Sequence, residues 1–192
     1  RRQRQMCIRD RPRGGEYVLE LCDGTRVWLN AASELMYPDH FSADQRKVVL
    51  KGEAYFEVTK DVKRPFSVVL GDMEVKVLGT SFNVSAYPGV KRQTTLIEGQ
   101  VAVNWHRQQV VIRPGQQAAE TDEGLRVASV NVMNYVGWKE HRFVYENKLL
   151  GEVLEDLERW YDVEVFVMHD EIRNLHLTAN LPRYENMDKV LE

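Results

Sequence analysis

The sequence has little cysteine and no long hydrophobic run. Only Cys7 and Cys22 occur in 192 residues, too few for a disulfide framework, so cysteine usage leaves the redox compartment open. No stretch approaches the roughly 18 apolar residues that cross a bilayer, and no charged-then-apolar signal peptide opens the chain. We therefore expect no membrane-spanning helix within this sequence.

Signatures of catalysis and of metal binding are also missing. The five histidines are scattered, with no H-E-x-x-H motif, C-x-x-C pair or two-histidine-carboxylate spacing. Neither a glycine-rich phosphate loop nor a G-x-S-x-G elbow occurs. The formal net charge of -3 argues against a nucleic-acid-binding protein. The sequence therefore predicts no catalytic residue, cofactor-binding residue or metal ligand, no small-molecule substrate, and a protein that is not an enzyme.

Two features leave a carbohydrate-related interpretation open. Glu53 and Glu57 could suggest a glycosidase pair, but four strand residues span about 13 Å, whereas such carboxylates lie about 5 to 9.5 Å apart. We expect both to face solvent or to bond a turn. An aromatic sugar platform is the second possibility, although packing in strands and in a helix stripe is the favoured role of the four tryptophans Trp28, Trp105, Trp138 and Trp160.

The sequence pattern predicts a series of short β-strands from residue 16 to about residue 132. Asp23-Gly24 lies between two alternating apolar runs and predicts a hairpin turn, since glycine adopts positive φ without a Cβ clash. Further strands are expected at residues 48–50, 54–58, 66–70, 73–77, 82–87, 94–97, 101–105 and 110–112. The pattern predicts a mainly β protein in which residues 13–133 form an all-β sandwich, barrel or stacked-hairpin domain.

A small α+β lobe is predicted for residues 134–192. Apolar side chains at six positions between Leu150 and Tyr161 follow the stripe of an amphipathic helix, which Asn147 is placed to cap. We expect strands at residues 143–145, 163–167 and 175–179, and a second helix capped by Asn186. The order is β-α-β-β-α, and we expect the lobe to be truncated at its C-terminus and to lean on the β domain or on a partner.

Arginine is crowded at the N-terminus, at Arg1, Arg2, Arg4, Arg9, Arg11 and Arg13. A basic arm of this kind could contact nucleic acid or a membrane surface. However, residues 1–11 look like translated adapter sequence, and we expect residues 1–12 to be a non-native or disordered segment.

Several ordered motifs resemble the FecR family, the iron-dicitrate-sensor type of anti-sigma regulator, in its Bacteroidetes form. The first is Leu21-x-Asp23-Gly24-Thr25-x-Val27-Trp28-Leu29-Asn30-Ala31, followed by Gly52-Glu53-Ala54-Tyr55-Phe56-Glu57-Val58 and Val77-Leu78-Gly79-Thr80-x-Phe82-Asn83-Val84. The lobe, with Leu154-Glu155-x-x-x-Arg159-Trp160-Tyr161, is similar to the family's C-terminal domain and to the signalling domains of secretins and TonB-dependent transducers. Cys22 stands where the family usually has proline.

The resemblance implies the periplasmic region of a single-pass inner-membrane protein whose membrane helix is not in this sequence. Its implied partners are the signalling domain of a TonB-dependent outer-membrane transducer and, through an absent cytoplasmic segment, an extracytoplasmic-function sigma factor. The implied function is a relay that controls genes for iron or glycan uptake. Two alternatives remain: a periplasmic carbohydrate-binding accessory β-domain, or a lobe that belongs to a secretin or transducer itself.

The residues fall into a scaffold set and a docking set. Turn chemistry and strand alternation account for the motif residues as scaffold: Asp23, Gly24, Thr25, Trp28, Asn30, Gly52, Glu53, Gly79, Thr80 and Asn83. An open sheet edge in the lobe could accept a partner strand by β-augmentation. The docking candidates are Val163, Glu164, Val165, Phe166, Val167, Leu175, His176 and Leu177.

Overall fold

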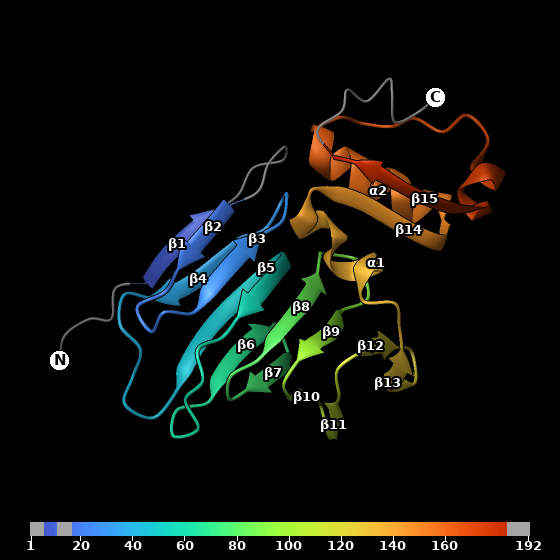
Figure 1. The fold of residues 1–192 in the computed structure, drawn as a ribbon. Helices are drawn as coiled ribbons and strands as arrows, with labels where there is room; N and C mark the ends of the chain where they lie inside the picture. Colours follow the sequence, from blue (N-terminus) through green and yellow to red (C-terminus); the bar gives the residue numbers. More distant parts are fainter. Residues whose placement is uncertain (1–5, 11–16, 184–192) are drawn as a thin grey trace.

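The computed structural model describes residues 6–10 and 17–183 (Figure 1). A large sheet of thirteen strands fills the lower left of Figure 1, and a small lobe lies at its upper right. The strands of the large sheet are β1 (Met6–Asp10), β2 (Tyr17–Glu20), β3 (Arg26–Leu29), β4 (Glu34–Pro38), β5 (Arg46–Glu57), β6 (Phe66–Leu70), β7 (Met73–Val77), β8 (Ser81–Ala86), β9 (Gln93–Glu98), β10 (Val101–Trp105), β11 (Gln108–Ile112), β12 (Gln116–Thr121) and β13 (Gly124–Ser129). The mainly β prediction is confirmed.

The long strand β5 turns the sheet back on itself, into a shape close to a barrel. Its first half pairs with β4 and, in parallel, with β6, while its second half pairs with β3 and β8. The bend lies at Gly52, whose φ is +93°, and a Cβ there would lie 2.7 Å from the Ser33 Cα. Only glycine can adopt this positive φ and tolerate the close approach of Ser33 without strain. The predicted break between two separate strands at this glycine is therefore a corner within one strand.

The predicted hairpin at Asp23-Gly24 is confirmed and joins β2 to β3. Gly24 has a φ of +79°, and the Asp23 carboxylate accepts hydrogen bonds from the Thr25 N–H at 3.1 Å and hydroxyl at 2.8 Å. The same carboxylate forms an ion pair of 2.8 Å with Arg46, whose side chain is completely buried. Asp23 thus ties the turn to the interior of the sheet.

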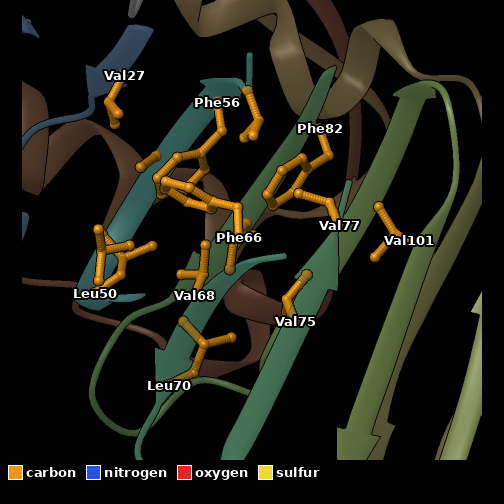
Figure 2. Close-up of a cluster of buried hydrophobic side chains, with 14 of the residues drawn as sticks. Val27, Leu50, Phe56, Phe66, Val68, Leu70, Val75, Val77, Phe82 and Val101 are labelled. Carbon is orange, nitrogen blue, oxygen red and sulfur yellow. The ribbon is translucent and has the colours of Figure 1, made fainter. Parts of the chain in front are cut away.

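The hydrophobic core lies between the two layers that the folded-back sheet creates, as Figure 2 shows. Phe56 and Phe82, opposite each other on β5 and β8, stack with ring centroids 5.2 Å apart. Phe66 from β6 packs against Phe56 from the other layer at 6.1 Å. Aromatic contacts of this kind add about 0.5 to 1.5 kcal/mol each to the burial of the rings.

A short helical linker leads from the sheet to the lobe. It consists of α1 (Met133–Val136) and the 3-10 helix η1 (Gly137–Glu140), and the lobe follows with β14 (Arg142–Leu149), α2 (Leu150–Tyr161), the 3-10 helix η2 (Asp170–Asn174) and β15 (His176–Pro182). β14 and β15 pair antiparallel, and the helix α2 lies beside them. The predicted apolar stripe of α2 is confirmed, because Val153, Leu154, Leu157 and Trp160 are its buried residues. None of the helices in the described parts is long and apolar enough to cross a membrane.

Two details of the prediction for the lobe are wrong. Residues 163–167 form no strand, because no described strand pairs with them, although every second side chain is half-buried. Asn147 does not cap α2; it has a φ of +50° at an irregularity of β14, and Leu149 occupies the N-cap position. Met6–Asp10, which lies within the segment expected to be non-native or disordered, pairs with β4. The predicted helix after Asn186 lies outside the described residues.

Candidate functional site at the junction of the sheet and the lobe

The lobe is seated on one end of the large sheet through an apolar insertion. Ala31, in the turn between β3 and β4, is 1 % exposed and belongs to the lobe's own hydrophobic cluster, with Phe143, Tyr145 and Leu157. The Ala31 carbonyl accepts a hydrogen bond of 2.8 Å from the hydroxyl of Tyr87 in the sheet. A sheet residue therefore completes the core of the lobe.

Arg183, directly after β15, is the central polar link of the junction. Its side chain is buried, and its Nη2 donates a 2.9 Å hydrogen bond to Asn30 Oδ1 of the sheet. Its Nη1 donates to the carbonyl of Trp138 in the linker at 2.9 Å. The guanidinium also lies 3.7 Å from the ring centroid of Trp160 on α2, which is a close cation–π contact. One side chain thus joins sheet, linker and helix.

A chain of amides and a carboxylate continues from Arg183 across the end of the sheet. Asn30 Nδ2 donates to Glu53 Oε2 at 2.6 Å, and Asn83 Nδ2 donates to Glu53 Oε1 at 2.8 Å. Asn83 Oδ1 in turn accepts a 3.2 Å bond from the indole N–H of Trp138. Burial raises the pKa of Glu53 above its ordinary value, although the two amides oppose that shift. The Glu53 carboxylate thus bonds Asn30 in the turn between β3 and β4, in line with the second of the two expectations for this residue, and also bonds Asn83 on β8.

A second set of charges lies on the lobe side of the junction. Asp156 on α2 forms ion pairs with Lys148 at 2.7 Å and with Arg159 at 2.6 Å. Burial alone would raise the pKa of Asp156, but the two cations outweigh it and hold the pKa below its ordinary value. The Arg159 guanidinium lies 4.3 Å from the ring centroid of Tyr87, so this set also touches the sheet.

A cavity of about 380 Å³, partly open to solvent, lies at the junction and is lined by residues of both parts, including Glu53, Tyr87, Tyr145 and Arg159. The hydroxyl of Tyr145 is buried and makes no hydrogen bond of ordinary geometry. Side chains of the sheet and the lobe are therefore not close-packed against each other over this part of the junction.

The scaffold set divides into two groups in the structure. Asn30, Glu53 and Asn83 meet at the junction, where Trp28 also stacks edge-on against Tyr55, beneath the ammonium of Lys139. The remaining motif residues hold the interior of the sheet, where the Thr80 hydroxyl donates to the Gln100 carbonyl at 3.1 Å and Gly79 passes close to the Lys60 backbone. This second group is Asp23, Gly24, Thr25, Gly52, Gly79 and Thr80.

The docking set lies on the lobe, away from the junction. Glu164 and His176 are exposed, and Phe166 is 82 % exposed. Val163, Val165 and Val167 are half-buried, and the last two pack against the lobe's core. His176 and Leu177 lie in β15, and the exposed Leu175 directly precedes it.

No group of three or more metal-ligating side chains occurs within residues 6–10 and 17–183. Trp138 and Trp160 are buried at 8 % and 6 % exposure, so neither forms part of an exposed aromatic platform. Arg183 and Ala31 were missed by the sequence reasoning. Neither carries a local signal, because their partners lie far away along the chain.

Comparison with known proteins agrees with this arrangement. The family model described as "FecR protein" matches residues 12–102, and the model described as "FecR, C-terminal" matches residues 142–192. The chain belongs to the FecR family. The family resemblance seen in the motifs is thereby confirmed, and the two matched ranges fall on either side of the junction.

Two crystal structures of candidate anti-sigma factors from Parabacteroides distasonis ATCC 8503 are similar to this FecR-family chain. The first has a TM-score of 0.90 and 27 % sequence identity over 97 % of this chain and 89 % of the other. The second has a TM-score of 0.89 and 27 % identity over 96 % and 88 % of the two chains. No curated protein matches the chain. Family and fold together support a regulator of a sigma factor rather than an enzyme.

Proposed function

We propose that this FecR-family chain is the periplasmic sensor region of an anti-sigma regulator. It relays a signal from the signalling domain of a TonB-dependent outer-membrane transducer to an extracytoplasmic-function sigma factor, and thereby controls genes for iron or glycan uptake. The chain would be held by a single inner-membrane helix outside this sequence, and the sigma factor would bind a cytoplasmic segment that is also outside it. Residues 13–133 and 134–192 would be its two domains.

The junction is the observation that carries this proposal. A relay needs a part that receives a partner and a second part that responds to it, with a contact that can change between them. The lobe offers exposed docking residues on its outer side, while Arg183 and Trp138 bond Asn30 and Asn83 of the sheet, and Ala31 of the sheet enters the lobe's core. A cavity beside these contacts is consistent with two arrangements of the lobe.

The route of the signal follows from this geometry. A partner that docks at Phe166 or His176 would exert force on the lobe at β15 and at the segment after α2. Arg183 directly follows β15 and stacks on α2, so a shift of either element would move its guanidinium relative to Asn30. We propose that this displacement is what the large sheet transmits onward.

Binding of the transducer signalling domain tests the proposal by calorimetry. The wild-type chain is expected to bind, and Glu164→Lys together with His176→Ala is expected to weaken binding, because the first reverses an exposed charge of the docking set and the second removes an exposed polar side chain from it. In cells, the same variant should reduce transcription from a reporter under the cognate sigma factor. Absence of wild-type binding would count against the relay. Unchanged affinity of the double variant would count against the assignment of the docking residues.

A glycan array separates the relay from the carbohydrate-binding alternative. Trp138 and Trp160 are buried, and the half-buried Trp28 and Trp105 pack against Tyr55 and Arg92, so we expect no quenching of tryptophan fluorescence by sugars. Saturable quenching by a glycan at micromolar concentration would favour the alternative.

A further inference from the structure

The segment between α2 and β15 exposes an unusual amount of apolar surface. We call residues 162–175 the outer face; in Figure 1 they arc over the side of the lobe that is turned away from the large sheet. The exposed fractions of its apolar side chains are 82 % for Phe166, 92 % for Met168, 58 % for Leu175 and 40 % for Ile172. Single exposed apolar residues are ordinary, but four large ones within ten residues indicate an interaction surface.

The first part of the outer face has the side-chain pattern of a strand without a strand partner. Val163, Val165 and Val167 are half-buried, while Glu164, Phe166 and Met168 alternate with them and are exposed. Glu158 on α2 holds the start of the segment, accepting bonds from the backbone N–H of Val163 at 3.3 Å and of Val165 at 2.8 Å. Among the described residues, nothing hydrogen-bonds to the backbone of Phe166 or Val167. These groups are free to pair with an added strand.

Acidic side chains surround the apolar positions. Three carboxylates lie among the exposed apolar side chains, at Glu164, Asp170 and Glu171, against a single arginine, Arg173. The side chain of Asp170 is 95 % exposed and only loosely paired with Arg173, at 3.8 Å. Its charge is therefore available to a partner rather than neutralised within the lobe.

We propose that the outer face binds an extended segment of a partner protein that carries lysine or arginine at both ends of an apolar centre. The segment adds a strand beside residues 163–167, places apolar side chains against Phe166 and Met168, and sets its basic residues opposite the acidic rim. This inference rests on the proposed function, in which the segment belongs to the transducer's signalling domain. It adds the chemistry by which that domain is recognised.

Charge decides between this occupant and two others. A second copy of the chain would place one acidic rim against another in a symmetric dimer, and like charges facing each other are unfavourable. An anionic membrane surface would repel the rim in the same way. A basic protein segment is the occupant that complements both the charge and the unpaired backbone.

The test measures binding of the transducer signalling domain to the whole chain at 0.15 M and at 0.5 M NaCl. Glu164→Lys with Glu171→Lys should raise the Kd about tenfold or more at the lower salt and by much less at the higher salt, since rim charges are screened. Phe166→Ala should raise the Kd about tenfold at both salts, because its contribution is apolar. The matched controls are Glu98→Lys with Glu123→Lys, and Val111→Ala, which alter exposed charges and an exposed apolar residue of the large sheet.

The outcomes separate this inference from the proposed function. If the wild type binds and the outer-face variants bind as the controls do, the inference is overturned while the relay stands. A charge effect that does not shrink with salt also overturns it, as does loss of a wild-type dimer in Phe166→Ala by analytical ultracentrifugation. If the wild type does not bind at all, the proposed relay fails and the inference falls with it. Circular dichroism should give every surface variant the wild-type Tm.

Discussion

Replacing Arg183 by methionine should loosen the lobe from the sheet without filling or emptying much volume. The change removes two hydrogen bonds of 2.9 Å, to Asn30 and to the Trp138 carbonyl, and the cation–π contact with Trp160. At about 1.5 kcal/mol per charge-assisted hydrogen bond and about 1 kcal/mol for the ring contact, the gross loss is about 4 kcal/mol. Relief of the buried charge offsets part of it, so we expect a net loss of about 2 to 3 kcal/mol.

Urea denaturation and amide hydrogen exchange measure this loss. The free energy of unfolding should fall by the stated amount, and exchange should accelerate in the linker and in β14 before it does in β5. Arg173→Met is the matched control, since the Arg173 side chain is 41 % exposed and should cost less than about 0.5 kcal/mol. If both variants lose less than 0.5 kcal/mol, Arg183 does not hold the junction together and the reasoning is refuted.

Three further predictions concern the sheet. Asp23→Asn should cost about 3 kcal/mol or more by urea denaturation, because it removes the negative charge that lies 2.8 Å from the buried guanidinium of Arg46; a cost below 1 kcal/mol would contradict this. Gly52→Ala should cost about 2 kcal/mol or more, since the φ of +93° and the approach to Ser33 both exclude a Cβ; an unchanged Tm would contradict it. The raised pKa of Glu53 means that the native state binds the proton of this carboxyl more tightly than the unfolded state does. The stabilisation from Glu53 is therefore complete below its ordinary pKa of 4.5 and is lost as the pH rises through the pKa of the folded state. Glu53→Gln should remove this contribution from a plot of unfolding free energy against pH.

Local patterns predicted much of the sheet. The turn at Asp23-Gly24 and the strands β6, β7 and β10 follow from alternation and glycine placement, which depend on neighbouring residues. The apolar stripe of α2 could also be predicted, because its helical spacing repeats over about three turns. β4 was missed, since Glu34–Pro38 mixes apolar and polar residues without clear alternation.

The junction could not be predicted in the same way. Asn30 and Arg183 are separated by 153 positions, and nothing near either residue indicates the other. Side chains of residues 163–167 alternate between half-buried and exposed, but strand pairing depends on a neighbour, and the described lobe supplies none. The motif residues that identified the family were predicted to be scaffold only. In the structure, Asn30, Glu53 and Asn83 also form a hydrogen-bonded chain that ends on Trp138 beside the lobe.

Hydrogen exchange of the chain with and without the transducer signalling domain is the most direct test of the relay. The account predicts protection of residues 163–177 on binding, together with a change in exchange at the linker and at the turn that carries Asn30 and Ala31. In Arg183→Met the first effect should persist and the second should disappear. Protection of the lobe with no change at the junction in the wild type would contradict the claim that the junction carries the signal.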